Sequence, residues 1–133
     1  IGGSAFQGCD SLTNINVPES VTSIGKDVFW GCHSLENISI PERVTSIEKF
    51  TFYACSSLTS INIPESVSSI GDLAFRLCTS LTSINIPESV TSIGKDAFWG
   101  CSNLEIVIDN SKKKVEVGWD AFENCKSVTW LKD

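Results

Sequence analysis

Six cysteines and one histidine are the residues of this sequence whose types could bind a metal, act as nucleophiles or form disulfides. Five of the cysteines recur at intervals of 23 residues, at Cys9, Cys32, Cys55, Cys78 and Cys101. The sixth, Cys125, comes one residue late. Zinc sites use closely spaced pairs such as C-x-x-C together with histidines. The sequence has no such pair and only His33, so it predicts neither a metal site nor another cofactor.

The single histidine also gives little support to catalysis. A nucleophilic cysteine needs a base that meets it in space and a third group that orients the base. His33 directly follows Cys32, and this adjacency in sequence does not indicate such a geometry. No phosphate-binding glycine loop is present either. We therefore do not expect the chain to be an enzyme.

The interval between the cysteines is the period of the whole chain. The prolines repeat at the same interval, at Pro18, Pro41, Pro64 and Pro87. A fixed period of roughly 20 to 50 residues indicates a solenoid, in which each repeat forms one coil that stacks on the coil before it. We place the coils in a single array over residues 1–133, near 9–31, 32–54, 55–77, 78–100 and 101–124, with a partial coil at 125–133.

Apolar residues mark the local structure within a coil. Residues 84–86 alternate apolar and polar side chains, as in a strand with one buried face. Pro87 ends that strand because proline has no N–H to donate. Residues 90–93 are rich in β-branched side chains and predict a second short strand. Gly94 is expected at a left-handed corner, and residues 96–101 predict a single helical turn.

The recurring pattern CxxLxxIxIPxxVxxIGxxAFxxC resembles the BspA-like leucine-rich repeat family, the branch with 23-residue repeats, over the whole chain. The resemblance implies a leucine-rich-repeat solenoid, a right-handed coil that is mostly β with a parallel sheet on its concave face. Short helical turns are expected on the convex side. The resemblance further implies a microbial protein, at the cell surface or secreted, that acts in adhesion and protein recognition. These functional expectations come from the family and not from the spacing.

The periodicity places all six cysteines in one inward-facing column. Neighbouring Cα atoms would lie about 5 Å apart, within the range that a disulfide tolerates. Stacked parallel side chains rarely offer the dihedral angle of a disulfide, however, and free cysteine is a common small core residue. We favour buried thiols over disulfides, and the cysteines leave the redox compartment undecided.

The array departs from its repeat near the C-terminus. Residues 106–108 and 115–117 look like two strands, and Asp109 to Lys114 between them are expected to form a mobile loop. The chain starts partway through a coil, and neither end carries the polar cap that solenoids need. We interpret the chain as a fragment of a longer array. The alternative is self-association through the uncapped ends.

Charge and hydropathy argue against two classes of partner. The formal net charge of -6 disfavours nucleic-acid binding, which needs a basic footprint. No run of about 18 apolar residues is present, so we expect no insertion into a membrane. The resemblance implies that the partner is a protein or a glycan.

Function in a solenoid resides in columns of equivalent residues. The outward positions of the concave strands are small, polar and uncharged, as at Asn62 and Asn85. These side chains either hydrogen-bond a peptide or glycan, or only bond along the stack, which we favour. Beyond them the column is expected to turn apolar at Ile106, Ile108 and Trp130. This apolar patch is either a contact site or a surface that an absent neighbouring domain would cover.

A second column lies two residues before each cysteine, on the convex side. It contains Trp30, Tyr53, Arg76 and Trp99, and Arg76 could form a cation–π contact between Tyr53 and Trp99. Aromatic residues and arginine are enriched at the energetic centres of protein interfaces. The column is therefore a candidate partner site, and the alternative is that its rings only cover the edge of the coils.

A third column is acidic, with one glutamate after each proline, at Glu19, Glu42, Glu65 and Glu88. Calcium needs about six to eight converging oxygen ligands, so one carboxylate per coil is too few and we expect a solvated edge. The resemblance implies a non-catalytic scaffold that recognises a protein or glycan at a cell surface. A structural spacer that holds other domains apart is the alternative function.

Overall fold

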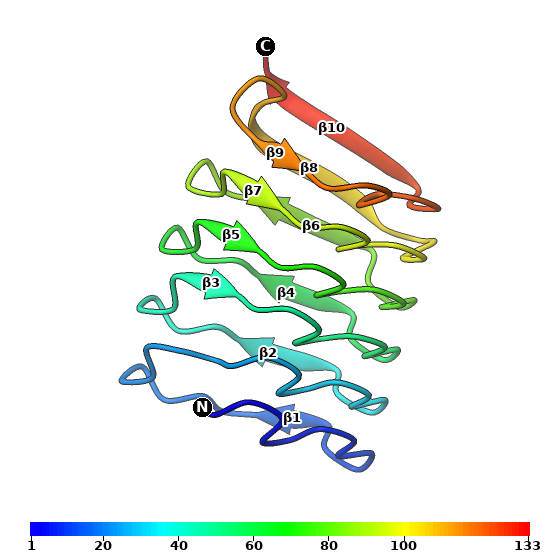
Figure 1. Cartoon of the computed structure of the whole chain (residues 1–133). Helices are drawn as coiled ribbons and strands as arrows, with labels where there is room; N and C mark the ends of the chain where they lie inside the picture. The colour runs from blue at the N-terminus through cyan, green and yellow to red at the C-terminus, as the bar shows by residue number, and fades with distance from the viewer.

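The computed structural model describes all 133 residues as one solenoid (Figure 1). Each full coil after the first passes through one strand at the back of this view and a two-residue strand at the front. The chain winds in a right-handed sense from the N-terminus at one end of the stack to the C-terminus at the other. The structure contains no helix that is long and apolar enough to cross a membrane.

The strands at the back of Figure 1 form the concave face. They are β1 (Asn14–Ile15), β2 (Asn37–Ser39), β4 (Ser60–Asn62), β6 (Ser83–Ile86), β8 (Glu105–Ser111) and β10 (Ser127–Lys132). Parallel pairing joins β1, β2 and β4 into one sheet and β6, β8 and β10 into another. Because β4 also lies against β6, the two sheets form one continuous surface.

The second strand of each coil forms a separate parallel ladder on the other side of the core. This ladder consists of β3 (Ser46–Ile47), β5 (Ser69–Ile70), β7 (Ser92–Ile93) and β9 (Glu116–Val117). Ile47, Ile70 and Ile93 are in register and point into the core. The prediction of a second short strand within residues 90–93 is confirmed.

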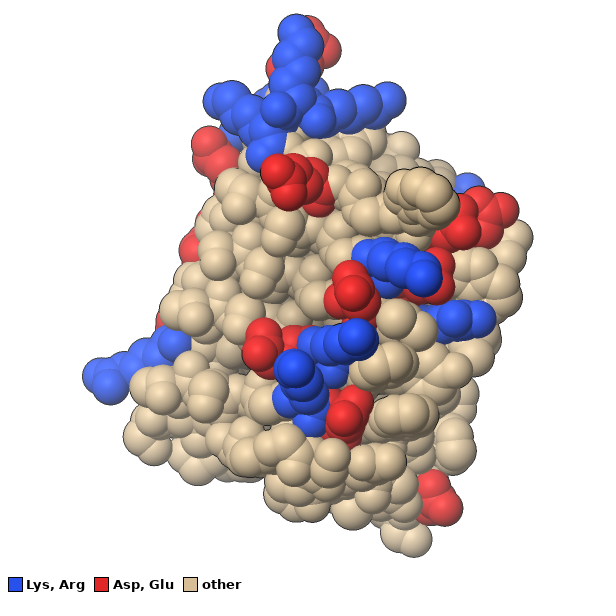
Figure 2. Space-filling view, viewed as in Figure 1, with Lys and Arg blue, Asp and Glu red and all other residues tan.

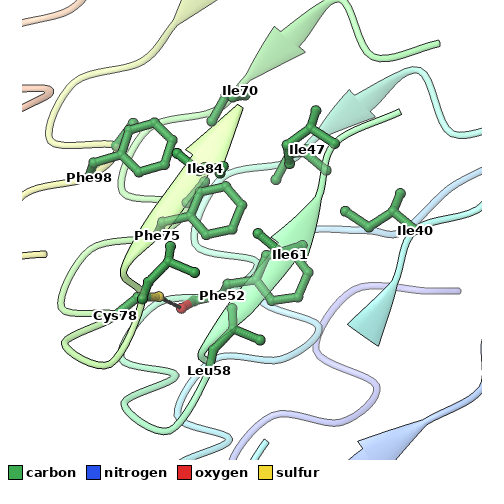
Figure 3. Close-up of a cluster of buried hydrophobic side chains, with 14 of the residues drawn as sticks. Ile40, Ile47, Phe52, Leu58, Ile61, Ile70, Phe75, Cys78, Ile84 and Phe98 are labelled. Atoms are coloured by element: carbon green, nitrogen blue, oxygen red, sulfur yellow. Dashed lines mark hydrogen bonds between the residues drawn. The ribbon is translucent and has the colours of Figure 1, made fainter. Parts of the chain in front are cut away.

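The core is built from columns that receive one side chain from each coil. Its 33 buried hydrophobic residues form one cluster. Phe52 and Phe75 stack with their ring centroids 5.2 Å apart, and Phe75 and Phe98 with theirs 5.1 Å apart. Figure 3 shows this phenylalanine column beside isoleucines from both ladders. The prediction that residues 23 apart become neighbours is therefore confirmed.

The segment predicted to form a helical turn instead forms a third ladder between coils. Every second N–H donates to a carbonyl of the next coil, as Phe52 does to Ala74 at 2.8 Å. The N–H groups between them close turns within their own coil, as Tyr53 does onto Phe50 at 3.1 Å. A helix would use all of these N–H groups inside its own segment. The hydrogen bonds between coils take its place, and the prediction of helical turns was wrong.

This turn ladder holds two residues of each coil in the left-handed conformation. The position next to each cysteine is occupied in turn by Gly8, Gly31, Ala54, Leu77, Gly100 and Asn124. Gly94, which we expected at a left-handed corner, is not among the residues with positive φ. It is glycine for another reason, because a Cβ atom there would lie 2.5 Å from the backbone nitrogen of Asp72.

Because this column holds glycine in some coils and alanine in one, it offers a matched pair of substitutions. Ala54 has a φ of 58°, and a left-handed alanine costs roughly 1–2 kcal/mol. Ala54→Gly should raise the free energy of unfolding by about 1 kcal/mol, after allowing for the freer unfolded chain. Gly31→Ala should lower it by a similar amount, since its φ is 72° and the nearest atom to a new Cβ lies 4.0 Å away. Urea denaturation of both variants measures the effects, and a loss of stability in Ala54→Gly would contradict this backbone conformation.

The strand β8 is longer than the sequence predicts. It continues through Asp109, Asn110 and Ser111, and the turn is confined to residues 112–114. Asn110 is buried, and its side chain donates to the Glu88 carbonyl at 3.2 Å and accepts from the Ser111 N–H at 2.8 Å. These bonds tie the end of β8 to the preceding coil. The predicted strand at 106–108 is confirmed, whereas the loop prediction was wrong for residues 109–111.

Candidate functional site

The concave face presents the row of small polar side chains that the sequence predicts. Asn62 and Asn85 are exposed, and their neighbours Ile61 and Ile84 are buried. Parallel pairing in register carries this alternation from coil to coil. The amide side chains of Asn62 and Asn85 form no hydrogen bond with the protein, along the stack or elsewhere. Their donors and acceptors are therefore free to meet a ligand.

Ile106 and Ile108 do not extend this row as an exposed apolar patch, and that prediction was wrong. β8 pairs Ile106 with Ile84, and Ile106 and Ile108 are only 1% and 0% exposed. The fifth coil has one residue fewer between Leu104 and its strand than the fourth coil has after Leu81. Counting from the cysteine therefore slipped by one residue, which moves every side chain to the opposite face.

The prediction that Trp130 belongs to an exposed apolar patch was also wrong. It pairs with Ile108 in the parallel ladder, and its half-buried ring packs against the core. The outward apolar residues at this end of the concave face are Val107, which is half-buried, and Leu131, which is 58% exposed. Counting from the leucine gives the same wrong face, because the missing residue comes after Leu104, so the repeat carries no signal that identifies Val107.

A shallow hollow of about 350 Å³ lies at this place on the concave face. Its lining includes two amides, two outward apolar side chains and two carboxylates, from Asn62, Asn85, Val107, Leu131, Glu65 and Asp109. The hollow thus joins two of the predicted site residues to apolar surface that the sequence analysis missed. This combination suits one apolar side chain with polar groups beside it.

Lys132 balances part of the acidic charge beside the hollow. Its Nζ lies 3.3 Å from the Asp109 carboxylate and 3.4 Å from the Glu88 carboxylate. The hydrogen bond to Asp109 is the main cause that raises the pKa of Lys132. Glu65 has no ion-pair partner, so its carboxylate is the free charge at the rim. A ligand with a cationic group next to its apolar side chain would complement it.

The convex column begins with three aromatic side chains that contact one another. Trp30 stacks on Phe50 with ring centroids 5.0 Å apart and meets Tyr53 edge-on at 5.2 Å. All three rings are half-buried. The rings therefore cover the coil edge and still present aromatic surface to solvent.

Arg76 continues this column. Its guanidinium lies 4.3 Å from the centroid of the Trp99 ring and 3.5 Å from the Asp96 carboxylate. The predicted cation–π contact with Trp99 is confirmed, and none joins Arg76 to Tyr53. Figure 2 shows Lys and Arg interleaved with Asp and Glu on the face turned to the viewer, and a larger group of basic side chains at the C-terminal end.

The cysteines form an inward column of free thiols. The inner four are fully buried, at Cys32, Cys55, Cys78 and Cys101. Cys78 Sγ–H donates to the carbonyl of Phe52 at 3.1 Å (Figure 3), and the same bond recurs in the other coils. Burial is the main cause that raises the pKa of Cys55 to about 12, and it raises that of Cys78 as well. The prediction of buried thiols is confirmed for the inner coils, and Cys9 and Cys125 are half-buried.

Stability should fall at alkaline pH because of these thiols. The pKa of Cys55 rises from an ordinary value of 9.0 to about 12 in the folded chain, so the unfolded chain loses its proton first. The stabilisation is complete below pH 9 and is lost as the pH rises toward 12. We expect the free energy of unfolding to fall by up to about 1.4 kcal/mol per pH unit in that window through Cys55 alone, and the raised pKa of Cys78 acts in the same direction. Urea unfolding at about pH 8, 9.5 and 10.5 measures how the free energy of unfolding changes with pH.

A Cys55→Ala variant provides the control for this pH dependence. It lacks one of the thiols, so its stability should fall less steeply with pH than that of the natural sequence. An equal slope in both proteins would show that Cys55 does not titrate as its burial requires.

The single histidine and the carboxylates that follow the prolines lie at separate places on the surface. His33 Nδ1 lies 3.4 Å from the Asp10 carboxylate, and both side chains are exposed. No three His, Cys, Asp or Glu side chains converge on a point where a metal ion could bind. The glutamates that follow the prolines are exposed in every coil.

Comparison with known proteins connects this architecture to a family. The sequence profile of the BspA type leucine rich repeat region matches residues 1–129 in six copies. The crystal structure of the T. pallidum leucine rich repeat protein TpLRR superposes with a TM-score of 0.77 at 31% identity, over 93% of this chain and 68% of that one. No curated protein sequence matches the chain significantly.

Two further crystal structures are similar to this chain. A leucine rich cell surface protein from Faecalibacterium prausnitzii A2-165 has a TM-score of 0.64 at 28% identity, and the match covers 96% of this chain and 44% of that one. A leucine-rich repeat protein from Bacteroides ovatus ATCC 8483 has a TM-score of 0.58 at 21% identity, over 98% of this chain and 64% of that one. The second likeness concerns the fold alone.

Proposed function

Because the chain belongs to the BspA-type leucine-rich repeat family, we propose that it is a non-catalytic module that recognises a protein ligand on its concave face. We further propose that this recognition serves adhesion at a cell surface or outside the cell. The family is one of repeat scaffolds for interaction, and one structural neighbour is a leucine rich cell surface protein. Both observations support the proposal.

The observation that carries the proposal is the hollow on the concave face. Val107 and Leu131 offer apolar surface to one side chain of the ligand. The unpaired amides of Asn62 and Asn85 can donate to and accept from a peptide backbone. Glu65 favours a lysine or arginine next to the apolar residue. The best match is an extended peptide segment with an apolar residue beside a basic one.

The convex column is a second contact surface within the same function. Trp30, Tyr53, Arg76 and Trp99 are half-buried and partly held by one another. Ordered aromatic and arginine side chains lose little conformational freedom on binding, which favours them as anchors. This surface suits a larger partner that reaches around the edge of the coils.

Self-association is the second candidate function. Hydrophobic side chains in the two end coils favour it. Phe6 and Leu12 at one end, and Phe122 and Trp130 at the other, are hydrophobic side chains that the core covers only in part. A second copy could continue the phenylalanine column across such a junction. Sedimentation velocity at several protein concentrations tests this idea, and a monomer throughout would reject it.

Selection from a phage-displayed library of random peptides tests the proposed function. We expect enriched peptides with an apolar residue next to lysine or arginine, and about a tenfold or larger loss of their affinity in the Leu131→Asp variant. Val117→Asp is the matched control, since Val117 is also exposed and apolar but lies on β9, in the other ladder. Peptides that bind Leu131→Asp as tightly as the natural sequence would contradict a concave site.

A further inference from the structure

We propose that a groove along the glycine corners binds a neutral glycan, with the ring of Trp119 as its stacking platform. The groove lies beside the ladder of β5, β7 and β9. It shares no lining residue with the hollow on the concave face. The proposal therefore stands or falls independently of a protein ligand at that hollow.

The groove exists because the coils approach too closely for side chains at their corners. A Cβ atom on Gly71 would lie 2.7 Å from the backbone nitrogen of Lys49, and one on Gly94 would lie 2.5 Å from that of Asp72. Gly118 meets the preceding coil in the same way. The absent side chains leave a groove of about 490 Å³ that crosses three coils.

Glu48 ends this groove on its N-terminal side. It stands where the other coils have their corner glycine, and its carboxylate accepts a hydrogen bond from Ser46 Oγ at 2.9 Å. The corner before it forms a separate hollow of about 230 Å³, which Glu48 lines. The sequence thus confines the larger groove to the third, fourth and fifth coils.

The walls of the groove offer hydroxyl and carboxylate groups. Ser69, Ser92 and Glu116 precede the corner, and Asp72 and Lys95 follow it. One Asp72 oxygen accepts the Lys95 N–H at 2.9 Å, which leaves the other oxygen open. Two carboxylates against one ammonium leave an excess of negative charge. The groove therefore disfavours sulfated or uronic-acid glycans and suits an uncharged one.

Trp119 directly follows Gly118, the last residue that lines the C-terminal end of the groove. Its carbonyl accepts the Asp96 N–H at 2.9 Å, as the Lys95 carbonyl accepts the Leu73 N–H at 2.9 Å. The shared bond places Trp119 at the position that Lys95 holds one coil earlier. Its side chain is 84% exposed, and its ring stacks on no other aromatic ring. An indole this exposed on a rigid backbone is a surface prepared for a flat apolar partner.

A pyranose matches these groups better than a peptide does. One face of the sugar ring carries C–H groups that can lie on the indole, and its hydroxyls can bond to serine and carboxylate side chains. The N–H groups of Gly71, Gly94 and Gly118 already donate to carbonyls of the preceding coil. A peptide strand would therefore find no free N–H at the corner with which to pair.

Titration with neutral hexasaccharides of cellulose, mannan, amylose and chitin, followed by tryptophan fluorescence and amide NMR shifts, tests the proposal. We expect at least one of them to bind and its affinity to fall about tenfold or more in Trp119→Ala. Ser92→Tyr, which fills the groove, should have the same effect. Trp99→Ala, on the convex column, should leave the affinity unchanged.

Three results would overturn the proposal. These are no binding of any neutral hexasaccharide up to about 10 mM, binding that survives Trp119→Ala, or binding only of a sulfated heparin hexasaccharide. Trp119 is exposed and outside the core, so its variant should unfold at the same urea concentration as the natural sequence. Because Trp119→Ala should fold normally, it tests the proposal even if Ser92→Tyr does not fold.

Discussion

Replacing Phe75 with alanine should lower the free energy of unfolding by about 3–5 kcal/mol. The ring is fully buried in the middle of the array and stacks between Phe52 and Phe98, at 5.2 and 5.1 Å. Its removal leaves a cavity and breaks two contacts between coils. Because a solenoid is held together by contacts between neighbouring coils, the loss falls on both interfaces of the third coil. Urea denaturation followed by circular dichroism measures it.

Asn85→Ala is the control for this prediction. Asn85 is exposed on the concave face and forms no hydrogen bond with the protein, so its loss should change stability by no more than about 0.5 kcal/mol. Phe6→Ala offers a second comparison, because Phe6 stacks on Phe29 alone, at 5.6 Å. Its cost should fall between the other two. Similar losses at Phe75 and Asn85 would mean that the inward and outward assignment is wrong.

The columns of the core could be predicted because the period of the sequence is constant. Once residues 23 apart stack, Phe52, Phe75 and Phe98 must form one column and Asn62 and Asn85 another. This inference needs no knowledge of the backbone between the positions. It failed where the period changes. One missing residue after Leu104 was enough to assign Ile106 to the wrong face.

The conformation of the turn ladder could not be predicted in the same way. Residues 96–101 have the composition of a helical turn, but their hydrogen bonds go to the next coil, as from Phe98 to Ala121 at 2.8 Å. Hydrogen bonds between coils leave no periodic signal within one coil. The sequence also places aspartate, phenylalanine, leucine and alanine at left-handed positions, where glycine or asparagine would have been the expected marker.

The candidate site residues in regular coils could be predicted, whereas those in irregular coils could not. Asn62, Asn85 and the Arg76–Trp99 contact follow from the repeat and were predicted from it. Leu131 and Trp119 lie in the irregular fifth and sixth coils, where counting from the cysteine gives no reliable face. Their exposure of 58% and 84% became visible only in the structure. In a repeat protein the departures from the repeat are where individual coils acquire their own surface, and insertions often mark the binding face.

Gly94→Ala should be among the most damaging single changes in the chain, with a loss of about 3 kcal/mol or more in the free energy of unfolding. The new Cβ would lie 2.5 Å from the Asp72 nitrogen and 2.7 Å from the Gly71 carbonyl carbon. Both are backbone atoms fixed by the ladders on either side, so no side-chain movement relieves the contact. The fourth coil must shift away from the third. Urea denaturation again measures the loss.

Gly2→Ala is the matched control, because no atom lies within 4 Å of a Cβ at that position, and its stability should be close to that of the natural sequence. The comparison also bears on the proposed glycan groove. At Gly71, Gly94 and Gly118 the coils approach too closely for a Cβ atom, whereas the second coil accommodates Glu48 at the equivalent corner. If Gly94→Ala were as stable as Gly2→Ala, the coils would not be in contact at the corner. The groove between Glu48 and Trp119 would then have no structural cause.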